Sequence, residues 1–320
     1  SYNGSSNTER LAASYALARL LAKSSSLADQ NDAISLFTQA QTLPLLHIDS
    51  LWHAAEIITS QGDSKKTRDL VEKILRDPAA DSKDQARALY EMAQSFLREP
   101  SSENNQKAKD LLLTLKQKYP ATEYGVASNY YLGQMALGNN SSNSGNNFLS
   151  TEASNGSATA NDGAFGSTIG NSNGASNGSA SSTASTSAGT TISAGEAEAL
   201  SYFSDYLEGS VNGRFSSDVA DKLMTLNAKG AALTPADLDR IGLVYYRKNN
   251  YGKALEAFNR SGTTNNQFRK AQCLAKLHRK PESVAALLAA IKQSPDSSYY
   301  DDFADVVTGH LSRAETAEVW

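Results

Sequence analysis

The apolar residues of this chain recur three and four positions apart, and each run of this pattern breaks off after 12 to 20 residues. Leu11, Tyr15, Ala18 and Leu21 form one such run. This spacing places apolar side chains on one face of an α-helix, whereas a strand would alternate them. Because no alternating segment is present, the sequence predicts an all-α fold of short helices, about seven on each side of a central segment.

The central segment, residues 138–193, has a different composition. It consists almost entirely of Gly, Ser, Asn, Thr and Ala, and Glu152 and Asp162 are its only charged residues. Such a composition cannot bury enough apolar surface to offset the entropy lost when a backbone is ordered. The sequence therefore predicts helical repeats in residues 1–137, a flexible low-complexity linker in residues 138–193, and helical repeats in residues 194–320.

The clearest repeat unit is the stretch IGLVYYRKNNYGKALEAF, which runs from Ile241 to Phe258 and joins two apolar helical faces at a pair of asparagines. The tetratricopeptide pattern has a bulky residue, Leu-Gly and Tyr on a first helix, and Ala then Phe on a second. The residues at these spacings here are Leu238, Ile241, Gly242, Tyr245, Ala254 and Phe258. We expect Gly242 and Ala254 to let the two helices approach, and Tyr245 and Phe258 to fill the space between this hairpin and the next.

Weaker copies of the unit are in phase with it. The residues at second-helix positions are Ala33, Phe37 and Ala40; Thr67, Val71 and Ile74; Ala108, Leu112 and Leu115; and Ser283, Leu287 and Ala290, while residues 130–137 are similar to a first helix. Repeats of this kind cannot bury their apolar faces alone, so they stack on one another. The resemblance to tetratricopeptide solenoids implies a right-handed superhelix of degenerate hairpins whose first helices line a concave surface.

Carrying the inward-facing positions over by phase gives nine candidate ligand-binding residues. They are Asp49, Trp52 and Glu56 before the central segment, and Asp239, Tyr246, Arg247, Phe268, Gln272 and Lys276 after it. Aromatic, charged and amide side chains on a curved face suit an extended peptide ligand. The alternative is that Trp52 and Phe268 pack between helices as core residues.

The reactive residue types form no catalytic or metal-binding pattern. The four histidines are scattered, and neither a phosphate-binding GxxxxGK[ST] loop nor a GxSxG motif occurs. We expect Cys273, in an apolar helical stretch, to be a small core residue. A net charge of −4 argues against nucleic-acid binding, and no apolar run is long enough to span a membrane. The sequence thus predicts a non-enzymatic protein without metal or cofactor.

Charge is unevenly distributed towards the end of the chain. Residues 247–280 contain nine Lys or Arg and a single acid, Glu256, whereas residues 296–318 contain six acids and Arg313. These segments could bind an anionic polymer or an acidic partner, pack two copies head to tail, or form ordinary solvated helix faces.

The C-terminal part also resembles the superhelical region that precedes the catalytic domain in bacterial soluble lytic transglycosylases. The similar stretches are LTP at 233–235, YYRKNNYGKALEAF, NQFRKAQCLAKLHRKPES and SPDS at 294–297. In that family the catalytic Glu stands in a Glu-Ser context within a lysozyme-like domain. Here Glu282 and Ser283 open a second repeat helix, so we do not expect Glu282 to be catalytic.

The resemblance implies a periplasmic or envelope-associated setting with an envelope protein or peptidoglycan as ligand. Together with the solenoid pattern, it favours a non-catalytic solenoid that binds a protein or peptide partner through its concave surface. The alternative is the superhelical region of a lytic transglycosylase, which would position peptidoglycan for a catalytic domain outside this chain.

Overall fold

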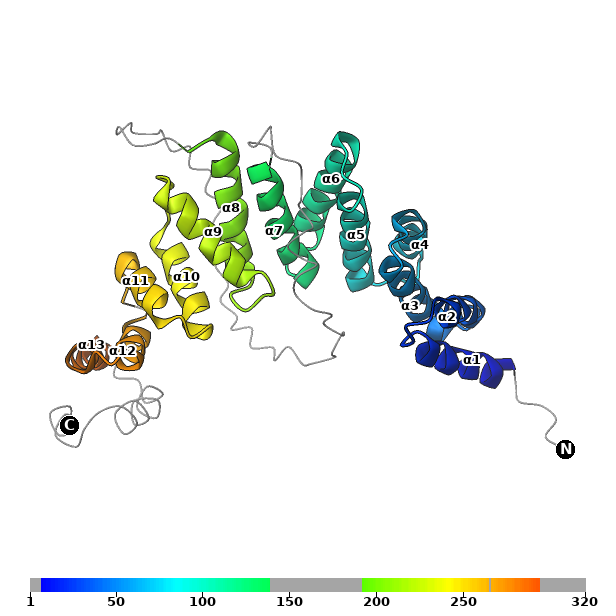
Figure 1. Ribbon diagram of the computed structural model, residues 1–320, viewed down its shortest axis with the longest axis horizontal. Helices are drawn as coiled ribbons and strands as arrows, with labels where there is room; N and C mark the ends of the chain where they lie inside the picture. The colour runs from blue at the N-terminus through cyan, green and yellow to red at the C-terminus, as the bar shows by residue number, and fades with distance from the viewer. Residues whose placement is uncertain (1–6, 139–191, 265, 294–320) are drawn as a thin grey trace.

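The computed structural model describes residues 7–138, 192–264 and 266–293 (Figure 1). Within these ranges the protein is built from α-helices and one 3-10 helix, with no β-strand, which confirms the predicted all-α class. The predicted linker lies outside the described residues except at its two ends, and so does the acidic segment 296–318.

Thirteen α-helices occur in the described residues, seven before the central segment and six after it. The first group is α1 (Asn7–Leu21), α2 (Leu27–Ala40), the 3-10 helix η1 (Pro44–Leu46), α3 (His47–Ser60), α4 (Ser64–Arg76), α5 (Ser82–Leu97), α6 (Ser102–Lys118) and α7 (Glu123–Gly138). The second group is α8 (Ala194–Gly209), α9 (Ser216–Ala228), α10 (Pro235–Arg247), α11 (Tyr251–Ser261), α12 (Gln267–Lys276) and α13 (Lys280–Gln293).

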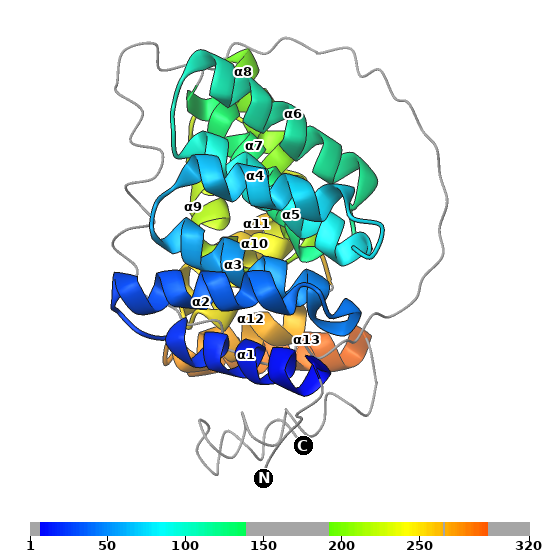
Figure 2. The ribbon, with the colours of Figure 1, turned by 90° about the vertical axis from the view of Figure 1, so that its right-hand side faces the viewer.

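The helices follow one another in chain order around an arch (Figures 1 and 2). Each helix packs on the next one, and the pairs α1–α2, α3–α4, α5–α6, α7–α8, α10–α11 and α12–α13 recur along the arch. Helix α9 stands between two pairs, where α10 contacts both α8 and α9. In Figure 1, α3, α5 and α7 lie towards the hollow side of the arch, and α4 and α6 lie along its outer side.

The same three kinds of buried residue build each of these six pairs. A small residue in the first helix faces a small residue, Thr or Ser in the second helix, and a larger apolar residue follows four positions later. The trios are Ala18, Ala33 and Phe37; Ala55, Thr67 and Val71; Ala93, Ala108 and Leu112; Gly133, Ala199 and Phe203; Gly242, Ala254 and Phe258; and Ala271, Ser283 and Leu287. Five of the six second-helix sites were expected from the sequence, and the one at Ala199 was not.

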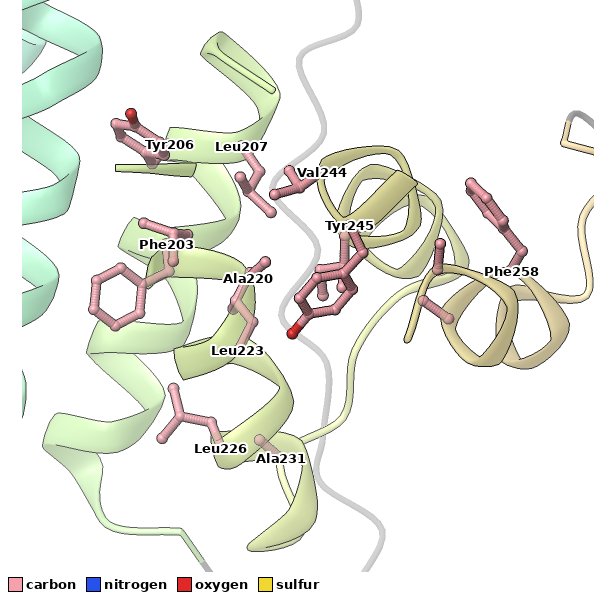
Figure 3. Packing of buried hydrophobic residues seen from close by; sticks show 14 of the residues in the cluster. Phe203, Tyr206, Leu207, Ala220, Leu223, Leu226, Ala231, Val244, Tyr245 and Phe258 are labelled. Atoms are coloured by element: carbon pink, nitrogen blue, oxygen red, sulfur yellow. The ribbon is translucent and has the colours of Figure 1, made fainter. Parts of the chain in front are cut away.

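Within the pair α10–α11, the ring of Phe258 lies directly against Gly242, where an added Cβ would be 2.4 Å from it. Tyr245 points back towards α9, with Val244 and Leu223 nearby (Figure 3), and its hydroxyl donates to Asp221 Oδ1 at 2.8 Å. The sequence predicts that Tyr245 and Phe258 fill the space between this hairpin and the next. Tyr245 instead faces the preceding helix α9, and the Phe258 ring packs against Gly242 inside the hairpin. The reason is that Gly242 leaves room for the whole ring.

The pair α7–α8 joins the two helical groups across the central segment. An added Cβ at Gly133 would lie 2.5 Å from the Phe203 ring, and one at Gly209 would lie 2.7 Å from Val126. Because residues early in α7 meet residues late in α8, the two helices are antiparallel. Their ends at Gly138 and Ala194 therefore lie on the same side of the pair, as at a hairpin turn.

Polar and aromatic contacts reinforce this joint. Lys116 Nζ donates to Asp205 at 2.6 Å, and the rings of Tyr130 and Phe215 stack with their centroids 4.0 Å apart and their planes 3° from parallel. The described helices before and after the central segment therefore pack on each other directly.

Comparison of the two glycine-containing pairs measures the length of the insertion. The glycine and phenylalanine that meet are 16 positions apart in α10–α11, at Gly242 and Phe258, and 70 apart in α7–α8, at Gly133 and Phe203. The difference of 54 residues is the extra chain inserted into the turn of the fourth pair.

We expect the fold to tolerate removal of this insertion. Replacing residues 139–195 by Lys-Asn-Asn, the turn of α10–α11, should keep the helical circular dichroism and raise the free energy of unfolding by about 1–2 kcal/mol, because a shorter loop costs less entropy to close. Asn249 in that turn has φ 59°, a left-handed conformation that Asn tolerates. Urea unfolding measures the change, with a scrambled insertion of the same length as control. Loss of helicity in the shortened variant alone would contradict the shared-turn geometry.

Candidate functional site

The three candidate residues of the N-terminal half lie together on α3. The hydroxyl of Tyr15, from α1, donates to Asp49. Burial and this hydrogen bond raise the pKa of Tyr15 to about 12. His53 Nδ1 lies 3.2 Å from Glu56 Oε2, and its Nε2 lies 3.8 Å from Asp49 Oδ2. One face of α3 therefore carries a connected row of polar side chains that reaches α1.

Trp52 is fixed by residues at the start of α5. A capping box begins this helix, in which Asp81 accepts from the Asp84 backbone N–H and Asp84 Oδ2 accepts from the Asp81 N–H. The other oxygen of Asp84 accepts the Trp52 indole N–H at 2.7 Å. The Arg87 guanidinium lies 4.1 Å from the centroid of the Trp52 ring. Trp52 is only 5% exposed, so it belongs to the core and contributes an edge to the surface.

Arg87 and Glu56 form the charged centre of the site. Arg87 donates to Glu56 Oε1 at 2.6 Å, which links α5 to α3. Burial alone would raise the pKa of Glu56, but hydrogen bonds from His53 and Arg87 outweigh it and lower that pKa to about 2. Glu56 is therefore a carboxylate at all physiological pH values, and the Arg87 pKa is raised in return.

These side chains surround a cleft of about 210 Å³ between α3, α4 and α5. Apolar groups of Trp52, Ala55 and Val71 contribute to its wall, together with the charged Glu56, Arg87 and Glu91 and with Thr59 and Ser60. Tyr124, in α7, lies within range of the charges of Arg87 and Glu91, and burial raises its pKa to about 12. The cleft thus combines an apolar wall with acidic side chains on α3 and α5, which are the first helices of consecutive pairs.

Two of the candidate residues of the C-terminal half are hydrogen-bonded to each other. The Tyr246 hydroxyl donates to Gln272 Oε1, which links the first helices α10 and α12. Arg247 is exposed and donates to Asn212 Oδ1. On α12, Phe268 is half-buried and Lys276 is exposed, so solvent reaches both side chains.

Asp239 differs from the other candidates because it is buried, with 9% exposure. Its Oδ2 accepts from the Thr263 hydroxyl at 2.6 Å, whereas its Oδ1 has no hydrogen-bond partner. A ligand on the surface of the arch therefore does not meet Asp239 directly.

Tyr15 and Arg87 are functional candidates that sequence reasoning missed, although their register marks them. Tyr15 stands three positions before the small residue Ala18, as Trp52 stands before Ala55. Arg87 stands six positions before Ala93, the register that Asp49 holds in α3. The phase that marks Asp49 and Trp52 in α3 therefore also marks Arg87 in α5 and Tyr15 in α1.

No cluster of three or more potential metal ligands occurs in the described part of the chain. Cys273 is fully buried, and burial raises the pKa of its thiol to about 12, which confirms its predicted role as a core residue. No helix in the described ranges is long and apolar enough to cross a bilayer.

No family model matches this chain, and no curated protein shows significant sequence similarity to it.

Proposed function

We propose that the protein is a non-catalytic helical-repeat scaffold that binds an extended peptide segment of a protein partner on its first-helix face. The observation that carries the proposal is the cleft between α3, α4 and α5, with Trp52 at its apolar wall and Arg87 and Glu56 at its charged centre. Small apolar clefts with a few convergent polar groups are the usual form of ligand sites.

The charges around the cleft favour a partner with basic residues. Two acids, Glu56 and Glu91, line the cleft together with the cation Arg87. Two more acids are bonded nearby, Asp49 to Tyr15 and Asp84 to Trp52. A partner peptide with an apolar side chain in the cleft and Lys or Arg on either side would complement both the apolar wall and the nearby acidic side chains. The row of first helices then extends the contact along the arch.

Selection from a library of short random peptides tests this proposal. We expect enriched peptides to contain Lys or Arg beside an apolar residue and to bind with Kd of about 1–100 µM. The variant Ser60→Arg, which places a long cation at the cleft, should weaken binding at least about tenfold, since it blocks the cleft and reduces its negative charge.

Ser35→Arg is the matched control. It makes the same change of residue, but Ser35 is exposed on the second helix α2, away from the cleft. Equal binding by wild type and Ser60→Arg would contradict the proposal. Retention on purified peptidoglycan sacculi at low salt, without peptide enrichment, would instead favour the peptidoglycan-positioning alternative.

A further inference from the structure

A second cleft, of about 330 Å³, lies between α11, α12 and α13. Polar side chains from all three helices line it, namely Asn259, Gln267, Lys270, Arg279 and Glu282. Arg279 and Glu282 are already joined, with Arg279 Nε donating to Glu282 Oε1 at 2.8 Å. The charge of Arg279 is therefore largely neutralised within the cleft.

Lys270 is a buried cation without such a partner. Its side chain lines the cleft, yet the residue is only 8% exposed. Among the described residues its ammonium makes no hydrogen bond or ion pair. Burial lowers the pKa of Lys270, and the negative charge of Asp239 opposes this effect. A buried ammonium that lacks a hydrogen-bonded anion is costly for the folded protein.

Asp239 does not supply the missing anion by direct contact. It lies in α10 and is itself buried, but its Oδ2 is bound to Thr263 and its Oδ1 has no hydrogen-bond partner. The charges of Asp239 and Lys270 therefore interact through space without forming an ion pair. Lys270 thus experiences the charge of one buried carboxylate and lines an open cleft, and an anion in that cleft would satisfy it.

The wider field of this region also favours an anion. The sequence from residue 247 to residue 280 contains nine Lys or Arg and one acid, Glu256. A surface with this excess of positive charge raises the local concentration of anionic ligands. The amide side chains of Asn259 and Gln267 add neutral hydrogen-bond donors at the cleft.

We propose that this cleft binds a carboxylate side chain of an acidic peptide segment, with the Lys270 ammonium as its charge partner and the Asn259 and Gln267 amides as further donors. The site differs from the α3–α5 cleft in position and in charge. It therefore gives the arch a second contact point with the opposite electrostatic preference, independent of the function proposed above.

Fluorescence anisotropy with labelled hexaglutamate on the full chain tests the proposal. Wild type should bind hexaglutamate and should not bind hexalysine at this site. Lys270→Met keeps the apolar stem and removes the charge, and it should weaken hexaglutamate binding at least about tenfold, as expected for loss of a hydrogen bond between charged groups. Lys248→Met, an exposed lysine of the same basic stretch, should weaken binding less than about twofold.

A measurement on the unmodified protein guards against misfolding of the variant. In nuclear magnetic resonance titrations with hexaglutamate, backbone amides of residues 267–274 and 279–286 should shift, while those of α3 should not. Equal losses in Lys270→Met and Lys248→Met, shifts confined to other helices, or no binding by wild type would each overturn the proposal. Free glutamate binding as tightly as the peptide would overturn its peptide part.

Discussion

The variant Phe203→Ala is expected to lose about 3–5 kcal/mol of the free energy of unfolding, the range found when large aromatic residues are removed from cores. Phe203 is fully buried and its ring fills the space left by Gly133 in the pair that joins the two helical groups. In stacked repeats cooperativity depends on the interfaces between neighbours. We therefore also expect the urea transition of this variant to broaden or split, which unfolding followed by circular dichroism will show.

Phe96→Ala is the matched control for this change. Phe96 is only half-buried, and Arg68 lies over its ring at 4.9 Å. Its removal should cost less than half as much and leave a single transition. A similar loss for both variants would mean that the α7–α8 joint has no special role in coupling the two helical groups.

The second large effect is expected at Gly242. The variant Gly242→Val should lose about 1–3 kcal/mol of the free energy of unfolding, the usual cost of overpacking a core, because its Cβ would lie 2.4 Å from the buried Phe258 ring. Adding Phe258→Ala should recover part of the loss, since the smaller side chain makes room for valine. A double-mutant cycle in urea measures this coupling, which we expect to exceed about 1 kcal/mol.

Gly252→Val controls for the change from glycine to a β-branched residue inside a helix. An added Cβ at Gly252, in α11, would have no heavy atom within 4 Å. We expect its stability to stay within about 0.5 kcal/mol of wild type, as is usual for surface substitutions. If Gly252→Val is as unstable as Gly242→Val, backbone propensity rather than the close approach of the helices explains the loss.

Much of the fold follows from the sequence, because its determinants are local. The spacing of three and four positions specifies helices without reference to the rest of the chain. Thr234, followed by Pro235, is a local start signal, and in the structure Thr234 caps α10 in a capping box with Asp237. The buried pairs such as Ala33 with Phe37 and Thr67 with Val71 are one helical turn apart, so their phase can be read directly.

The candidate site was predictable only in part. Trp52 and Glu56 were found from the register of α3, and the bond between Tyr246 and Gln272 joins two residues named for the same reason. The contacts that pair the charges of the site could not be predicted in this way. Arg87 meets Glu56 across 31 positions of sequence, and such a contact depends on how α5 is oriented against α3.

The sequence by itself determined the helices, most of their turns and the buried face of five of the six second helices, since these depend on residues within one or two turns of each other. Only the tertiary structure decided that α7 and α8 are the two halves of one pair and that Lys270 is buried without an anion. Both depend on contacts between distant segments. The 54 inserted residues separate Gly133 from Phe203 in sequence, and the spacing of either helix alone carries no information about its distant partner.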